Sequence, residues 1–172
     1  MIALLLERLR RAAGQRPSAS GWAETALLAL GFAVVATPLA LRAELIGSTW
    51  LLPVPESLAL GLRVLLVPAL LEEVLFRVLP NPGRAEASGR LTNWVSAASS
   101  VTAYVLIHPA AALLGGGAQF TDPTFLALVA LLGVSCLVAY RRTGSLWPAV
   151  LIHWLVVVGW LGLGGHGPLS GV

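Results

Sequence analysis

The stretch Leu71-Glu72-Glu73-Val74-Leu75-Phe76-Arg77 places three charged residues inside a long apolar run of the chain. That run, residues 57–79, is close to the roughly 20 residues that an α-helix needs to cross the hydrocarbon core of a bilayer. A charge in the middle of such a helix is costly unless it is paired or faces a wet cavity. Because two adjacent carboxylates cannot both point into lipid, the stretch predicts a packed membrane helix with a polar site on one side.

The whole chain has the composition of a membrane protein. Of its 172 residues, 57% are hydrophobic and 11% are charged, and its mean hydropathy is +0.84. These charges are too few to form the polar shell of a soluble domain of this size. The net charge of +3 comes from arginine alone among the basic residues. A basic balance can indicate nucleic acid, but these arginines lie mostly between apolar runs, so we predict membrane lipid as the partner and no nucleic acid.

Five segments are apolar and long enough to cross a bilayer: residues 22–41, 57–79, 96–114, 123–140 and 145–163. Turn-forming proline, glycine and asparagine residues separate them. The sequence contains neither an internal repeat nor a stretch with the composition of a soluble module. We therefore predict one all-α, polytopic membrane domain over residues 1–172, with about five transmembrane helices and a core at about 57–163.

The first residues of the chain have an amphipathic pattern. At 100° per residue, Ile2, Leu5, Leu6 and Leu9 lie on one face of a helix. We expect residues 2–13 to form an interfacial helix on the membrane surface, the alternative being a frayed basic tail.

The arginines predict the orientation of the chain. Three basic gaps fall on one side of a five-span arrangement, and positive residues favour the cytoplasmic face. We therefore predict a cytoplasmic N-terminus and a C-terminus on the opposite face. The apolar residues precede the first arginines, which is the reverse of a secretory signal, and with the short loops this favours a bacterial inner or intracellular membrane. The arginines concerned are Arg8, Arg10, Arg11 and Arg16, then Arg84 and Arg90, then Arg141 and Arg142.

The charged stretch separates into a pair and a single carboxylate. Glu73 and Arg77 are four residues apart, on one helix face and in the favourable acid-before-base order. A paired buried charge is tolerable, so we expect this pair to support the site. Glu72 is rotated from Glu73 by about 100° and is predicted to be the free carboxylate. The alternative is that all three residues only clamp helices together.

Two histidines in other apolar segments are candidate partners of Glu72. With a helical rise of about 1.5 Å per residue, Glu72 and His153 lie roughly 10 and 12 Å from the same membrane face. His108 reaches a similar depth only if its helix overhangs the membrane over residues 91–100, which we expect, together with a kink at Pro109. His166, in the Gly-rich tail, is predicted to be a solvated bystander.

A carboxylate and two imidazoles around one pocket suit hydrolysis. In one route Glu72 is a general base, His108 holds the attacking water, and His153 donates to the oxyanion. In the other route Glu72, His108 and His153 bind zinc and leave a coordination position for water. Spacing alone does not choose between them. A transporter or proton-relay role is a third reading, which five spans without a repeat disfavour.

These residues also resemble a known family. Glu72-Glu73-x-x-x-Arg77, an aromatic residue four before His108, and His153 after Ser-Leu-Trp-Pro-Ala resemble the CPBP intramembrane proteases, over about residues 66–160. That family includes CAAX prenyl proteases and bacteriocin-processing and self-immunity proteins. The resemblance implies an all-helical fold with a cavity open to the cytoplasm and a glutamate-based mechanism without a metal cofactor. It implies Glu72, His108 and His153 as catalytic residues, in the roles of the first route, and Glu73, Arg77 and Tyr104 as supporting residues.

Two positions depart from the family pattern. The family often has phenylalanine where this chain has Tyr104, and it commonly has asparagine where this chain has Val157. The asparagine would share the oxyanion with the histidine, and losing one such donor costs about 100- to 1000-fold in rate. We expect an intramembrane endopeptidase acting on a membrane-anchored or hydrophobic peptide. The alternative is a weak or inactive member that serves as a membrane binding, assembly or immunity factor in a complex with a protein partner.

Overall fold

The fold was analysed in a computed structural model, which describes residues 1–83, 86, 88–115 and 117–165. These residues form helices and connecting loops without a strand, which confirms the all-α prediction. Arg84 and His166, named above, lie outside the described residues. In chain order the elements are α1 (Ile2–Gly14), α2 (Ala19–Arg42), α3 (Val54–Val64), η1 (Leu65–Leu70), α4 (Leu71–Glu73), η2 (Val74–Val78), α5 (Arg90–Leu113), η3 (Ala118–Thr121), α6 (Pro123–Thr143) and α7 (Leu146–Gly162).

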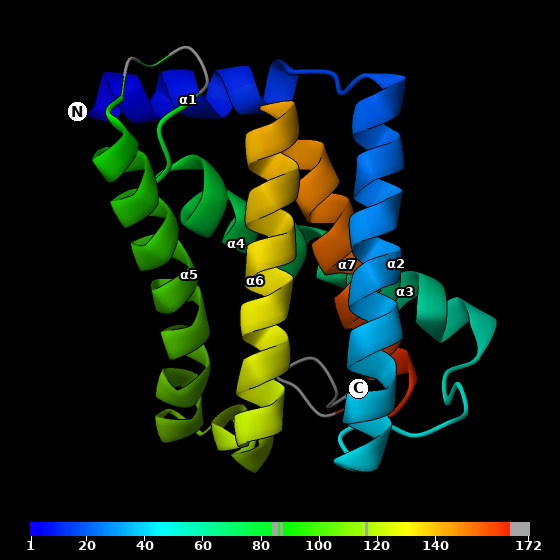
Figure 1. The fold of residues 1–172 in the computed structure, drawn as a ribbon. Coiled ribbons are helices and arrows are strands. Elements are labelled where there is room, and N and C mark those ends of the chain that lie inside the picture. Colours follow the sequence, from blue (N-terminus) through cyan, green and yellow to red (C-terminus); the bar gives the residue numbers. More distant parts are fainter. Residues whose placement is uncertain (84–85, 87, 116, 166–172) are drawn as a thin grey trace.

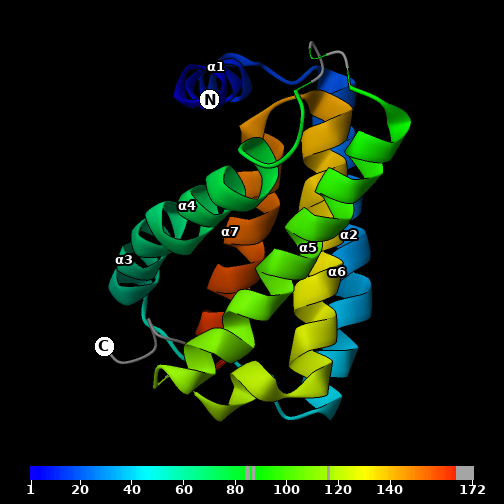
Figure 2. The same ribbon diagram turned by 90° about the vertical axis from the view of Figure 1, so that its left-hand side faces the viewer.

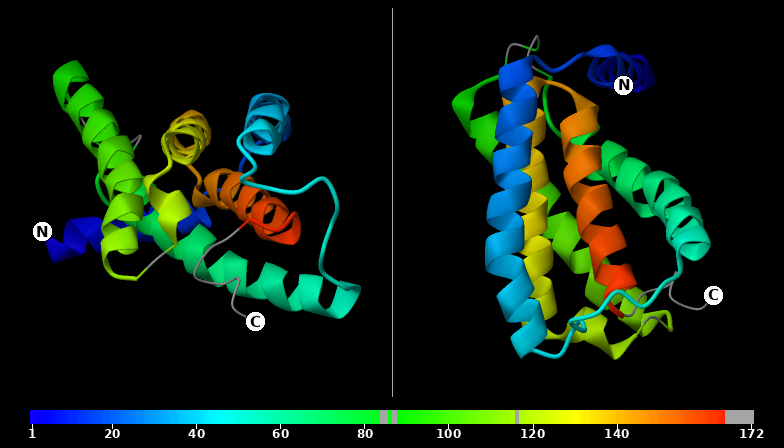
Figure 3. Two further views of the ribbon diagram at one scale, coloured as in Figure 1. Left: turned by 90° about the horizontal axis from the view of Figure 1, so that it is seen from below. Right: turned by 90° about the vertical axis from the view of Figure 1, so that its right-hand side faces the viewer.

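Three upright helices, α2, α5 and α6, form the frame of the molecule (Figure 1). Each is long and apolar enough to cross a membrane. The shorter apolar helix α7 packs against α6 and α2. Seen from below, α7 lies between α2 and the segment that begins with α3 (Figure 3). The chain is thus an integral membrane protein in which four of the five predicted segments form continuous helices.

The second predicted segment, residues 57–79, is a broken helix. It runs from Val54 to Val78 and is interrupted at Val67, whose backbone is extended (φ −140°, ψ 117°). Pro68 follows, and a residue before proline is biased away from the α-helical region. Figure 2 shows α3 and α4 running obliquely across the upright helices. The break and the tilt carry Glu72 and Glu73 into the interior of the bundle.

The N-terminal helix α1 lies across one end of the bundle (Figure 1). Arg8 Nη1 donates to the backbone oxygen of Leu79 at 2.6 Å, and the same guanidinium pairs with Glu86. The hydrogen bonds from Arg8 lower the pKa of the Glu86 carboxyl below its usual value. At the other end of the helix, Trp147 Nε1 donates to the oxygen of Ala13 at 2.8 Å. Residues Ile2–Gly14 are therefore helical, as predicted, and do not form the frayed tail that was the alternative. The contact of this helix with the membrane surface stays a prediction.

The third predicted span is the single helix α5, which contains residues 91–100 and continues through Pro109 to Leu113. Its Tyr104 and Ser100 are buried, whereas Leu91 and Leu106 are exposed on its outer side. The inner face of α5 therefore carries the residues that contact the broken helix. The overhang of its first turns beyond the bilayer stays a prediction.

Candidate active site

The two glutamates lie on α4, between π-helical turns that free backbone carbonyls. In η2 the amide of Leu79 donates to the oxygen of Val74, five residues back, at 3.0 Å. Such wide turns often occur at functional sites. Here the oxygen of Phe76 accepts from Ser100 Oγ of α5 at 2.6 Å. The broken helix is thereby fastened to α5 one turn away from the glutamates.

Glu73 and Arg77 form the predicted ion pair in the interior. Glu73 Oε2 lies 3.1 Å from Arg77 Nε, and neither side chain is exposed. The angles at this contact are not those of a hydrogen bond, so the attraction is mainly Coulombic. The guanidinium carbon also lies 4.5 Å from the centre of the Tyr104 ring, a favourable cation–π arrangement. Arg77 is therefore held between a carboxylate and an aromatic face.

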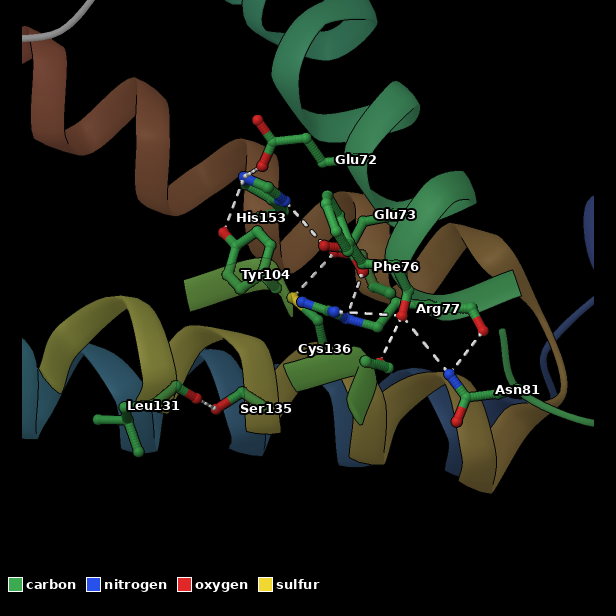
Figure 4. Close-up of polar contacts among 12 residues, drawn as sticks. Glu72, Glu73, Phe76, Arg77, Asn81, Tyr104, Leu131, Ser135, Cys136 and His153 are labelled. Carbon is green, nitrogen blue, oxygen red and sulfur yellow. Dashed lines mark hydrogen bonds and ion pairs between the residues drawn. The ribbon is translucent and has the colours of Figure 1, made fainter. Parts of the chain in front are cut away.

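His153 of α7 contacts both glutamates, one through each ring nitrogen (Figure 4). Its Nδ1 lies 2.8 Å from Glu73 Oε1, and its Nε2 lies 3.7 Å from Glu72 Oε2 and 3.5 Å from the Tyr104 hydroxyl. Glu73 is paired with Arg77 and so is a carboxylate, which only accepts. The Nδ1 proton therefore points to Glu73, and Nε2 is the nitrogen that faces Glu72 and Tyr104. Sequence reasoning assigned only Arg77 to Glu73 and missed its contact with His153.

His108 of α5 is oriented by its own helix. Its Nδ1 donates to the backbone oxygen of Tyr104, one turn earlier, at 3.0 Å. Because a carbonyl only accepts, this assigns the proton to Nδ1 and leaves Nε2 with a lone pair. The ring packs edge-on against Tyr104, Phe120 and Phe125, with centroid distances of 5.4, 5.8 and 5.6 Å. An imidazole held in this way presents a fixed acceptor.

Glu72, His108 and His153 line one cavity of about 770 Å³, together with Tyr104. The structure thus brings the three predicted catalytic residues to a common chamber from three different helices. The Glu72 side chain is 21% exposed, against 0% for Glu73, so Glu72 is the carboxylate that a bound molecule can reach. Most of the wall is apolar, including a row of small residues from α2: Ala26, Ala29, Ala33, Ala36 and Ala40.

The zinc alternative lacks a suitable ligand group. Among the described residues, no three histidine, cysteine, aspartate or glutamate side chains are close enough to hold one metal ion. His153 also directs Nδ1 to Glu73 and has Tyr104 beside Nε2. In the described structure, therefore, Glu72, His108 and His153 are not arranged as a set of zinc ligands.

A polar network beneath the ion pair was not predicted. Asn81 is fully buried; it donates to the oxygen of Arg77 at 3.0 Å and accepts from Arg141 Nη2 at 3.1 Å. Sequence reasoning treated Asn81 as a turn residue because prolines flank it. The position of Asn81 in the sequence could have indicated this role. It lies one turn after Arg77 at the end of an apolar segment, where a side-chain amide can donate to carbonyls that the helix end leaves free.

Residues 54–159 match the family model described as Type II CAAX prenyl endopeptidase Rce1-like. The chain belongs to this family. The matched range contains the broken helix, α5, α6 and most of α7, and therefore every candidate residue of the cavity. Membership in the Rce1-like family makes the chain a peptidase at the level of the family and agrees with the resemblance noted from the motifs. Comparison with curated proteins and with solved structures found no match.

Val157, where the resemblance implies asparagine, lies one turn after His153 and also lines the cavity. Its side chain has no hydrogen-bond donor. Helix α7 of this Rce1-like chain therefore supplies the imidazole of His153 to the site and no amide from position 157. Any second donor must come from another wall of the chamber.

Proposed function

We propose that this chain is an intramembrane endopeptidase that hydrolyses a peptide bond of a membrane-associated substrate, with Glu72 as the base that activates water. The observation that carries the proposal is the different environment of the two adjacent glutamates. Glu73 is enclosed and engaged by Arg77 and His153, whereas Glu72 is accessible and shares an apolar cavity with His108. Membership in the Rce1-like family supports the reaction type.

The proposed reaction needs a water molecule between Glu72 and His108 Nε2. Glu72 takes one proton from this water while the water oxygen bonds to the carbonyl carbon of the substrate. The electron pair of the carbonyl bond moves to the oxygen and forms an oxyanion. When the carbon–nitrogen bond breaks, the proton on Glu72 passes to the departing amine, which restores the carboxylate. His153 donates to the oxyanion from Nε2 when it carries its second proton, while its Nδ1 proton stays directed to Glu73.

The substrate in this proposal is a peptide with an apolar chain near its C-terminus. The family is named for CAAX prenyl endopeptidases, and the cavity has the small apolar side chains of α2 along one wall. A prenyl group or an apolar side chain would bury its surface there, at a gain of about 25 cal/mol per Å². In this proposal α1 and the arginine-rich gaps lie on the cytoplasmic side, and no cofactor takes part.

The test uses the purified protein in lipid vesicles with an internally quenched peptide that ends in a farnesylated CAAX sequence. Glu72→Gln should lower the cleavage rate by about 100-fold or more, as expected for loss of a general base. Glu56→Gln is the matched control because Glu56 is exposed at the start of α3, and it should cleave at the parental rate. Chelators should have no effect.

Two results would contradict this mechanism. Cleavage by Glu72→Gln at the parental rate would remove Glu72 from the reaction, and chelator sensitivity that zinc reverses would replace the glutamate route with a metal route. A third result would favour the binding-factor alternative that Val157 raises. In that case the parental protein cleaves nothing, and Glu72→Ala and His108→Ala preserve a cellular phenotype that deletion of the chain abolishes.

A further inference from the structure

We infer that the hydroxyl of Tyr104 is a catalytic group of this site, the donor that binds the oxyanion in place of the amide that Val157 lacks. The inference rests on the proposed endopeptidase function and concerns one atom of its machinery. Tyr104 comes from α5 and lines the same cavity as Val157 of α7. The donor would thus have moved from one helix to another.

The position of the hydroxyl supports this role. It lies 3.5 Å from His153 Nε2 (Figure 4), and the same nitrogen lies 3.7 Å from Glu72 Oε2. When His153 carries its second proton, the two groups are donors 3.5 Å apart, and both can lie about 2.8 Å from one oxygen, which is the distance that oxyanion binding requires. The Tyr104 hydroxyl and His153 Nε2 therefore flank a point beside Glu72, where this inference places the carbonyl oxygen of a bound peptide.

Whether His153 Nε2 can donate depends on the charge of the ring. With its Nδ1 proton directed to Glu73, a neutral His153 has only a lone pair at Nε2 and cannot donate to an oxyanion. The phenol of Tyr104 carries its proton whether or not His153 is charged. Its contact with Nε2, at 3.5 Å, is longer than a good hydrogen bond. The hydroxyl proton can therefore turn to an oxyanion without losing a strong partner.

The ring of Tyr104 is buried and is held by contacts from three neighbouring residues. It is 1% exposed, Arg77 covers one face, and Phe76 contacts it edge-on with centroids 5.6 Å apart. A Cβ atom at Gly133 would lie 3.0 Å from the ring, so α6 approaches closely there because residue 133 has no side chain. A donor fixed in this way needs no reorganisation when the negative charge forms.

The test compares three variants with the parental protein, using the farnesylated quenched peptide described above. Tyr104→Phe removes only the oxygen and should lower kcat by about 100-fold with little change in KM, as for loss of one oxyanion donor. Tyr140→Phe makes the same chemical change at the other tyrosine of the chain, outside the cavity, and should cleave at the parental rate. Tyr104→Phe combined with Val157→Asn should recover at least 10-fold of the loss, which a purely structural role of the hydroxyl would not allow.

The outcomes separate this inference from the proposed function. If the parental protein cleaves in a Glu72-dependent way and Tyr104→Phe is equally active, or if the added asparagine restores nothing, the inference is wrong and the endopeptidase proposal stands. If the parental protein is inactive and Val157→Asn alone creates cleavage, Tyr104 does not replace the amide, although the remaining site is competent. If neither protein cleaves, both proposals fail.

Discussion

Replacing Glu73 with glutamine should destabilise the fold by several kcal/mol although it hardly changes the shape of the side chain. The amide oxygen can still accept from His153 Nδ1, so the variant mainly removes the negative charge 3.1 Å from Arg77 Nε. At an effective dielectric constant of about 20, two unit charges at that distance attract by about 5 kcal/mol. Breaking one partner of a buried pair typically costs about 3–5 kcal/mol. Both side chains are fully buried, so solvent does not screen the loss.

A double-mutant cycle isolates this charge interaction. Arg77→Met leaves Glu73 uncompensated and should cost a similar amount, whereas the double variant Glu73→Gln/Arg77→Met leaves neither charge unpaired. The double variant should therefore be more stable than either single variant, with a coupling of about 2 kcal/mol or more. Thermal unfolding in detergent, followed by the fluorescence of the six tryptophans, measures it. For a chain of this size a loss of about 3–5 kcal/mol lowers Tm by roughly 6–20 °C, and Glu56→Gln is the control.

Additive losses in this cycle would refute the reasoning. If the double variant were as unstable as the sum of the single variants, Glu73 would not be the ionised partner of Arg77. The assignment of the Nδ1 proton of His153, which depends on a charged Glu73, would then also be unsupported. The requirement for a second oxyanion donor would lose that part of its basis.

Three further predictions address the packing, the N-terminal helix and the orientation. Gly133→Ala would put a methyl group 3.0 Å from Tyr104. It should lower kcat by about 10-fold or more, because small displacements of reacting groups are costly. Gly31→Ala, with nothing within 4 Å of the new Cβ, is the control in the same kinetic assay. The pKa of Glu86 is lowered in the fold by Arg8, so its contribution is present above the ordinary glutamate pKa of about 4.3 and is lost as the pH falls through the lower folded value. Hydrogen exchange over Ile2–Gly14, corrected for intrinsic rates, should therefore speed up on acidification in the parental protein, and a parental pH profile equal to that of Glu86→Gln would contradict the contact. The orientation can be tested in a Cys136→Ser background, which has no cysteine. An impermeant maleimide should label Gln15→Cys only from the cytoplasmic side and Thr49→Cys only from the opposite side. The reverse labelling pattern would overturn the predicted orientation.

The features that the sequence predicted correctly depend on local rules. The Glu73–Arg77 pair follows from the four-residue spacing of a helix and from the cost of an isolated charge in lipid. The meeting of Glu72, His108 and His153 at one cavity follows from their depths along apolar segments, once the third helix is extended to Arg90. Neither inference needs knowledge of how the helices rotate against one another.

The features that were missed depend on packing between helices. The contact of Glu73 with His153 requires a particular rotation of α7 against α4, which the hydrophobic pattern does not encode because α7 is apolar almost all round. The break at Val67 had a visible cause in Pro68, but the apolar run continues across it, and the length of that run outweighed the proline. Asn81 was likewise predicted to be a turn residue from the prolines beside it in the sequence, and its hydrogen bonds with Arg77 and Arg141 were not foreseen.

The consecutive glutamates explain why one short helix can both support and operate the site. Adjacent residues on a helix point about 100° apart, so one carboxylate can enter the protein interior while the next faces the cavity. In this chain the two carboxylates meet again at opposite nitrogens of His153, and the imidazole therefore links the permanently paired group to the accessible one. Moving either glutamate by one residue would turn it away from its nitrogen, which makes the adjacency itself a requirement of the chemistry. The oxyanion donor has no such constraint, because any helix that faces the carbonyl oxygen can supply it, and Tyr104 on α5 is in that position.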